Sequence, residues 1–154
     1  MIDVKPVGKD ALDRLGALMW DAIHNGPSAY TAAQRQAWLP EVPKGAPWAA
    51  RVGDQQIWLA QQDGMALGFV TLADGGYVDF AYVHSAAQGR GVFRHLMTAL
   101  ETAARTQGTA RLWTHASLMA QPAFARLGFR VIRHEDVARD GQTLSRAEME
   151  KALT

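Results

Sequence analysis

The period of the hydrophobic positions changes several times along the chain, and each change predicts a new element. Short apolar runs rich in β-branched and aromatic residues are typical of strands, whereas apolar residues that recur every three or four positions are typical of amphipathic helices. The strand pattern occurs at residues 2–7, 56–61, 66–72, 77–83, 111–116 and 129–133. The helical pattern occurs at residues 10–23, 32–38, 48–51, 92–107 and 121–127. Strands interleaved with helices in this way predict a domain of the α/β (α+β) class.

Local signals fix some of the element ends. Asp63 and Gly64 lie between two strand patterns and predict a tight hairpin turn, because Asp-Gly tolerates the positive φ values that such a turn requires. Thr31 is placed to cap the helix over 32–38. Residues 144–153 are ambiguous, since their central residues favour a helix by local propensity.

Composition and charge narrow the function classes. A chain of 154 residues has the size of a single domain, spanning 1–154, and 48% hydrophobic with 20% charged residues is ordinary for a globular protein. The net charge of +1 gives no case for nucleic-acid binding. The absence of cysteine excludes disulfides and thiolate nucleophiles and is compatible with a cytoplasmic location. The first residues do not resemble a signal peptide, and no apolar run approaches membrane-spanning length. The five histidines lack metal-ligand spacing, so no metal is expected.

The junction at residues 88–93 carries the strongest chemical signal. A strand pattern ends shortly before Gly89 and Gly91, and a helical pattern starts directly after them. A helix start presents unpaired N–H groups and the positive end of the helix dipole, and glycines let a phosphate approach that backbone. Arg90 and Arg94 add positive charge nearby. The junction can therefore seat a pyrophosphate, although a glycine turn that binds nothing has the same pattern.

Several segments resemble the GNAT superfamily of N-acetyltransferases. Residues 83–92, VHSAAQGRGV, are similar to its acetyl-CoA motif Q/R-x-x-G-x-G/A, and residues 116–129 are similar to its second cofactor-side segment, which ends in Gly-Phe. Residues 30–38, 82–84 and 149–151 resemble the YafP-like branch of the superfamily. The resemblance implies a mixed, mostly antiparallel sheet of six to seven strands with about four helices and a V-shaped split at the fourth strand. It also implies that residues 144–153 form a last strand, with Asp140-Gly141 as the hairpin turn.

The resemblance implies that acetyl-CoA is the co-substrate and assigns residues to it. The backbone of the fourth strand would pair with the pantetheine arm, which involves Ala81, Tyr82 and Val83. The pyrophosphate would be held by the main chain of Gln88, Gly89, Arg90, Gly91, Val92 and Phe93. Ser117 and Phe124 occupy two further cofactor-side positions, although Ser117 can equally be a strand-end cap. Phe93 departs from the small residue of the motif, and its side chain could narrow the phosphate turn.

Acetyl transfer to an amine needs a group that accepts a proton from the amine. A group that donates a proton to the leaving thiolate can assist but is not required. Asp79 is the candidate base, because a carboxylate in an otherwise apolar strand is costly unless it is paired, hydrated or used. Period-2 alternation places Asp79 on the same strand face as Tyr77 and Ala81. The alternative is that Asp79 pairs with a neighbouring polar group. The position of the usual tyrosine acid is Phe124, so Tyr82 or Tyr30 would have to serve, or water.

The acceptor side is the least constrained part of the chain. By analogy with the superfamily, Tyr30, Gln34 and Trp38 would line the substrate pocket. The resemblance implies a small-molecule or peptide amine as acceptor, direct transfer within a ternary complex, and a homodimer as one form of the protein. The alternative is a catalytically weak acyl-CoA-binding or interaction module, because Phe93 and Phe124 both depart from the motif.

Overall fold

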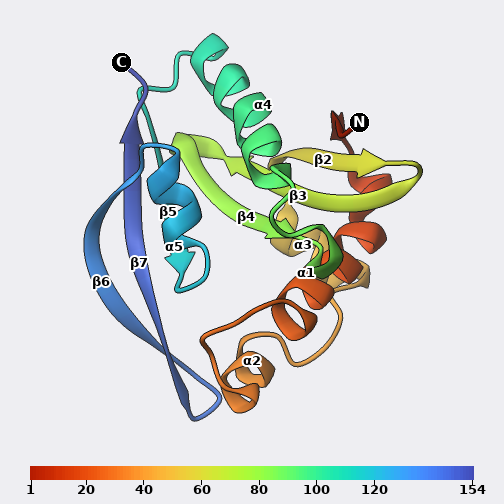
Figure 1. Cartoon of the computed structure of the whole chain (residues 1–154), viewed down its shortest axis with the longest axis vertical. Coiled ribbons are helices and arrows are strands. Elements are labelled where there is room, and N and C mark those ends of the chain that lie inside the picture. Colours follow the sequence, from red (N-terminus) through yellow and green to blue (C-terminus); the bar gives the residue numbers. More distant parts are fainter.

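A seven-stranded mixed sheet forms the centre of the protein, described over residues 1–154 by a computed structural model (Figure 1). The strand order is β1-β2-β3-β4-β5-β7-β6, and every neighbouring pair is antiparallel except β4 and β5. The strands are β1 (Asp3–Val7), β2 (Gln56–Gln62), β3 (Met65–Ala73), β4 (Tyr77–Val83), β5 (Arg111–Ser117), β6 (Arg130–Arg139) and β7 (Gln142–Ala152). The helices are α1 (Leu12–Asn25), α2 (Ala32–Trp38), α3 (Gly45–Val52), α4 (Val92–Thr106) and α5 (Gln121–Arg126).

The predicted element order is confirmed, with five α-helices where about four were expected. Thr31 caps α2 as predicted, through a bond from the Gln34 N–H to its hydroxyl at 3.1 Å. The ambiguous segment 144–153 lies in strand β7, as the family resemblance implied. Because β7 pairs with β5 on one edge and β6 on the other, this hydrogen bonding outweighs the local preference for helix. Asp140 and Gly141 form the hairpin turn with φ values of 44° and 78°.

The sheet divides between β4 and β5. The two strands pair in parallel only at Tyr77 with Trp113 and at Val78 with Thr114, and they part beyond these positions. In Figure 1, β6 and β7 form an arm that diverges from β2, β3 and β4. The predicted V-shaped split at the fourth strand is therefore confirmed.

Strand β4 carries a bulge at the start of the split. Val70 of β3 pairs with Ala81 and Leu72 pairs with Val78, so β4 contains one extra residue between these pairs. The bulge turns Val78 and Ala81 toward the same core cluster, although they are three positions apart. The prediction that Asp79 shares a face with Ala81 was therefore wrong, because simple alternation fails across a bulge.

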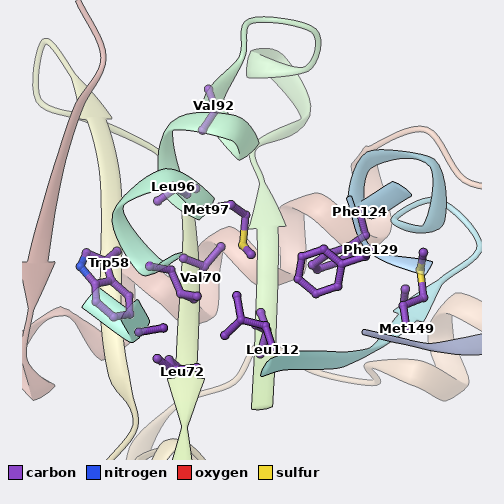
Figure 2. Close-up of a cluster of buried hydrophobic side chains, with 14 of the residues drawn as sticks. Trp58, Val70, Leu72, Val92, Leu96, Met97, Leu112, Phe124, Phe129 and Met149 are labelled. Carbon is purple, nitrogen blue, oxygen red and sulfur yellow. The ribbon is translucent and has the colours of Figure 1, made fainter. Parts of the chain in front are cut away.

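Each face of the sheet has its own apolar core. The larger cluster packs α4 and α5 onto the sheet, and its members in Figure 2 include Val70, Leu72, Val92, Leu96, Met97, Leu112, Phe124, Phe129 and Met149. The second cluster packs α1 and α3 onto the opposite face, around Leu15, Trp48, Leu59, Phe69 and Phe80. The indole N–H of Trp48 donates to the Leu12 carbonyl at 2.8 Å, which satisfies a buried polar atom. With both faces packed, β4 is held firmly while one of its edges is left open.

Candidate functional site

The start of α4 is free of any capping side chain. Gly89 and Gly91 have φ values of 75° and 79°, and Gly91 is the residue directly before the helix. The first backbone bond of the helix runs from the His95 N–H to the Gly91 carbonyl at 3.1 Å, so the amides of residues 92–94 lack a partner within the protein. A Cβ built on Gly89 would meet no atom within 4 Å. This open row of N–H groups fits an anionic group such as a phosphate.

Hydrogen bonds connect the loop that leads to this turn to α1, to β4 and to β2. The carboxylate of Asp21, on α1, accepts the Ser85 N–H at 2.7 Å and the Ser85 hydroxyl at 2.9 Å. Although burial alone would raise the pKa of Asp21, these hydrogen bonds hold it below its ordinary value. The side-chain amide of Gln88 donates to the Val83 carbonyl at 3.1 Å, and Arg90 donates to Gln62. The turn is therefore held next to the end of β4.

An aromatic cluster lies behind the turn. Phe93 packs edge-on against Phe124 with ring centroids 5.0 Å apart, and Phe124 packs against Phe129 at 4.9 Å. Phe124 is only 1% exposed. The side chain of Phe93 thus packs with the core cluster, and Phe124 lies inside that core and not on an open cavity wall.

The β5-facing edge of β4 leads from the bulge to the glycine turn. On its other edge, Ala81, Tyr82 and Val83 pair with Val70, Phe69 and Gly68 of β3. Toward β5, no strand pairs with β4 beyond Val78. An extended ligand with amide groups could pair with this edge as an added strand.

A cavity of about 480 Å³ opens on the α1 and α3 side of the split. Its walls come from the segment between α1 and α3, from β4 and β5, and from the tip of the β6–β7 hairpin. The side chains that line it include Tyr30, Trp38, Arg51, Tyr77, Asp79, Tyr82, His115, Ser117, Arg139 and Arg146. Aromatic rings and charged groups therefore face the same space, as in many small-molecule sites.

Two of the three predicted acceptor residues line this cavity. Trp38 packs against Tyr30 and Tyr82, with ring centroids 5.6 and 6.2 Å away. Gln34 does not line the cavity, which corrects the expectation for this residue. Its side-chain oxygen accepts the Thr31 N–H at 2.8 Å, and its nitrogen donates to the Thr143 carbonyl at 2.8 Å. Gln34 thus caps α2 and fastens it to the β6–β7 hairpin.

The hydroxyl of Tyr30 is fully engaged in structural bonds. It donates to the Ser145 carbonyl at 2.5 Å and accepts the Leu118 N–H at 3.0 Å. The ring is 6% exposed, and burial raises the pKa of Tyr30 above its ordinary value. Tyr30 therefore joins the cavity wall to β7 and to the loop before α5, and it has no free proton to give.

Asp79 faces the cavity but both of its oxygens are occupied. Arg51 of α3 donates to Oδ2 at 2.5 Å and to Oδ1 at 2.9 Å, and Gln55 donates to Oδ2 at 2.8 Å. The Asp79 side chain is 9% exposed, and the hydrogen bond that Arg51 donates to it raises the pKa of Arg51. The guanidinium also lies 4.6 Å from the centroid of the Phe80 ring. The structure thus contains the pairing that the sequence left open as the alternative to a catalytic base.

Tyr82 and Ser117 differ in the freedom of their hydroxyl groups. The phenol of Tyr82 makes no hydrogen bond, and burial raises its pKa well above the ordinary value. The hydroxyl of Ser117 accepts the Ala120 N–H at 3.3 Å, which makes it a cap of the turn after β5. Of the two hydroxyl groups, that of Tyr82 is the one without a hydrogen-bond partner.

Tyr77 and His115 form a pair that the sequence did not reveal. Their Oη and Nδ1 atoms lie 2.8 Å apart, and both side chains line the cavity. Tyr77 and His115 are 38 residues apart along the chain, so no local sequence pattern joins them. The pair is brought together by the parallel alignment of Tyr77 with Trp113, a register that the sequence does not mark.

Two further features concern clusters of metal-ligating side chains and membrane-spanning helices. No group of three or more His, Cys, Asp or Glu side chains lies close enough together to hold a metal ion. None of the helices has both the length and the apolar composition needed to cross a membrane.

Comparisons with known proteins agree on one family. The model of the acetyltransferase (GNAT) domain matches residues 27–153. The uncharacterized N-acetyltransferase YafP of Escherichia coli K12 is 27% identical over 90 residues, a match that spans 58% of this chain and only 56% of that protein. The GCN5-related N-acetyltransferase (aminotransferase, class II) from Rhodopseudomonas palustris superposes with a TM-score of 0.87 and 27% identity, over 97% of this chain and 94% of that one.

One neighbour was solved with its cofactor. The structure of yncA from Salmonella typhimurium with acetyl-CoA has a TM-score of 0.69 and 19% identity, over 100% of this chain and 95% of that chain. At this level of identity the likeness concerns the fold.

Proposed function

Because the chain belongs to the GNAT acetyltransferase family, we propose that it transfers the acetyl group of acetyl-CoA to a primary amine of a small molecule or peptide. The observation that supports this most is the parting of β4 from β5 just before the uncapped start of α4. An open strand edge and a row of free amides follow each other along one path. Such a path suits a ligand that has an amide-bearing arm at one end and a pyrophosphate at the other.

The residues along this path suit the parts of acetyl-CoA. The main chain of Ala81, Tyr82 and Val83 would pair with the pantetheine arm. The pyrophosphate would be held by the turn formed by Gln88, Gly89, Arg90, Gly91, Val92 and Phe93. Ser117 and Phe124 would support the cofactor side from β5 and α5, with Phe124 acting through the packing of Phe93. Bound acetyl-CoA supplies an acetyl group that is already activated as a thioester.

The acceptor would occupy the cavity beside the open edge. Tyr30 and Trp38 form its wall, and Asp79, Tyr82 and Tyr77 face the same space from β4. Direct transfer within a ternary complex fits this arrangement, because the chain has no cysteine nucleophile and the Ser117 hydroxyl is engaged by Ala120.

Two predicted catalytic residues receive different roles. Tyr82 would donate a proton to the departing thiolate, since its hydroxyl is protonated and unbonded. Asp79 would act as a fixed anion that positions Arg51 and Gln55, since three hydrogen bonds already occupy both of its oxygens.

The proposal is tested by calorimetric titration with acetyl-CoA, followed by thiol release with a panel of amines, peptides and aminoglycosides. Binding together with amine-dependent thiol release supports the transferase. Binding without release would favour the catalytically weak acyl-CoA-binding module, to which the phenylalanine at position 124 points. A titration without heat of binding would overturn both. The cytoplasmic location, expected from the absence of cysteine, and the homodimer, expected from the resemblance, stay predictions.

A further inference from the structure

Building on the proposed function, we propose that Tyr77 and His115 form a proton relay for the acceptor amine. In this relay Tyr77 Oη receives the proton from the nitrogen, and His115 Nδ1 receives the proton that Tyr77 gives up. The inference concerns which groups handle the proton, and it replaces Asp79 as the base.

The relay is built into the base of the split. Tyr77 is the first residue of β4 and pairs with Trp113, so the side chain of His115, two positions later on β5, lies beside the Tyr77 ring. The Oη to Nδ1 distance is 2.8 Å, and the ring centroids are 5.6 Å apart in an edge-on arrangement. The indole of Trp113 packs at 4.4 Å from the Tyr77 ring and fixes its orientation. Two neighbouring side chains of β5, Trp113 and His115, thus hold the Tyr77 side chain at the cavity surface.

No other potential proton acceptor in the cavity is both available and held in a defined position. The Asp79 carboxylate is held by Arg51 and Gln55. The hydroxyl of Tyr30 is bonded to two backbone groups. Glu41 lines the cavity from the loop after α2 and is exposed to solvent, so no packed element fixes its position. An imidazole behind a tyrosine is the remaining acceptor with a defined geometry.

The charges around His115 come from three strands. Tyr77 faces it from β4, Arg133 and Glu135 face it from β6, and Arg146 and Glu148 face it from β7. The Nε2 atom lies 3.6 Å from Glu135 Oε1 and 4.0 Å from Glu148 Oε1. Both carboxylates also pair with arginines, at 2.8 Å for Arg146–Glu135 and 3.1 Å for Arg133–Glu148. The two carboxylates therefore stabilise an N–H on Nε2, which leaves Nδ1 as the acceptor.

The titration properties of the pair agree with this geometry. Burial, followed by the positive charge of Arg146, lowers the pKa of His115 below its ordinary value. Burial, followed by the negative charge of Asp79, raises the pKa of Tyr77. At neutral pH the pair is therefore a neutral imidazole that accepts from a protonated phenol.

The proton balance of the step is simple. A primary amine that arrives as an ammonium loses two protons from its nitrogen in becoming an amide. The relay takes the first, which frees the lone pair, so an N–H bond breaks and a new O–H bond forms on Tyr77. The second leaves the nitrogen after attack on the thioester and replaces the proton that Tyr82 gives to the thiolate. The original O–H bond of Tyr77 breaks, and an N–H bond forms on Nδ1 of His115. The imidazolium then has both nitrogens protonated, with Nε2–H facing Glu135 and Glu148, and it returns its extra proton to water. No oxidant, reductant or further co-reactant is needed.

Nitrogen NMR of the free protein tests the relay without any cofactor. With ¹⁵N-labelled histidine at neutral pH, His115 is expected as the tautomer protonated on Nε2, and Tyr77→Phe is expected to reduce the preference for that tautomer. A proton on Nδ1 of wild-type His115 at neutral pH would overturn the relay even if the enzyme shows no activity with any amine tried.

Kinetics supplies the second test and separates the relay from the proposed function. Thiol release by the wild-type protein tests the transferase itself. Given release, His115→Gln and Tyr77→Phe should each lower kcat/KM for the amine at pH 7 roughly 100-fold or more, with the Kd for acetyl-CoA unchanged within about twofold. His115→Gln should also remove the fall in rate at acid pH that protonation of His115 causes, at a pH below the ordinary histidine pKa. The control is His134→Gln, an exposed histidine on β6, which should behave as wild type.

A different kinetic pattern would contradict the relay. If His115→Gln retains the wild-type rate, or loses the same factor at every pH while keeping the acid limb, His115 does not receive the proton.

Discussion

Arg51 forms a bidentate salt bridge with Asp79, with Nη1 2.5 Å from Oδ2 and Nη2 2.9 Å from Oδ1. This pair joins α3 to the bulged part of β4 at the edge of the cavity. The side chain of Arg51 is 54% exposed whereas that of Asp79 is 9% exposed, so solvent weakens the pair from one side only. Asp79 therefore has a structural role, the binding of Arg51, and this role competes with any role as a general base.

Asp79→Asn is therefore expected to act through geometry. The variant should lose about 1 kcal/mol of unfolding free energy, since Arg51 can turn to solvent. Its kcat/KM should fall by the same factor at every pH between 6 and 9, measured as thiol release. A loss that shrinks toward high pH would instead mark Asp79 as the base. Asp54→Asn, an exposed acid nearby, is the matched control.

Two glycines separate backbone strain from cofactor binding. Gly89 and Gly108 lie near opposite ends of α4, have φ values of 75° and 79°, and have open space where a Cβ would go. Each change to alanine should cost about 1–2 kcal/mol of stability, because both place a side chain in the left-handed region. Only Gly89→Ala should raise the calorimetric Kd for acetyl-CoA, by roughly tenfold or more, since the loss of about 1.4 kcal/mol of binding free energy has that effect. Equal affinities for the two variants would show that the turn does not hold the cofactor.

Two tyrosines of the cavity separate stability from turnover. Tyr30→Phe removes the partner of the Ser145 carbonyl and the Leu118 N–H, which should cost about 1–3 kcal/mol in urea unfolding. Tyr82→Phe removes no hydrogen bond, so stability should change by less than about 0.5 kcal/mol. We expect its kcat to fall at least roughly tenfold if the phenol protonates the thiolate. A Tyr82→Phe enzyme with full turnover would leave water as the proton source.

Close packing of β3 on α4 depends on Gly68. A Cβ at this position would lie 2.8 Å from the Tyr82 carbonyl and 3.1 Å from side-chain atoms of Leu96 and Val92. Gly68→Ala should therefore lower the unfolding free energy by about 1–3 kcal/mol, because overpacking forces the helix and strand apart. Gly8→Ala is the control, since its nearest neighbour is an Asp10 side-chain atom at 3.5 Å. Similar denaturation midpoints for the two variants would disprove the close contact.

The contact between Asp21 and Ser85 should make stability depend on pH. Because the pKa of Asp21 is lowered on folding, its contribution is complete above the ordinary value of 3.8 and is lost as pH falls through the folded value. Asp21→Asn should cost about 1 kcal/mol at pH 7, the low end for a charged hydrogen bond that solvent partly screens. The difference from wild type, measured by urea unfolding, should narrow toward pH 3. Asp13→Asn, on an exposed part of α1, is the matched control.

Local chemistry made much of the fold predictable. Thr31 and Gln34 satisfy the first turn of α2, and Asp63 and Gly64 adopt the positive φ values, 52° and 78°, that their hairpin requires. These features depend on residues close together in the chain. Strand β7 was different: its own residues favour helix, and only the family resemblance gave the right answer.

The candidate site was predictable only in part, for a topological reason. The glycine turn is contiguous in sequence and was found from its motif. The bulge in β4 has no sequence mark, and it changed which side chains accompany Asp79. The partners of Asp79 and His115 lie 28 and 38 residues away, so their pairing depends on sheet register and on the placement of α3.

The bonds from Tyr30 and Gln34 to the β6–β7 hairpin have a practical consequence for redesign. Residues 28–44 alone would be the obvious segment to exchange between relatives in order to change acceptor preference. However, Tyr30 and Gln34 in that segment donate hydrogen bonds to the main-chain carbonyls of Ser145 and Thr143, so a transplanted segment keeps these bonds only where the recipient's β6–β7 hairpin follows the same path. Chimaeras that carry residues 28–44 together with residues 136–146 should fold stably and change acceptor selectivity. Chimaeras that exchange only one of the two segments should mostly be less stable.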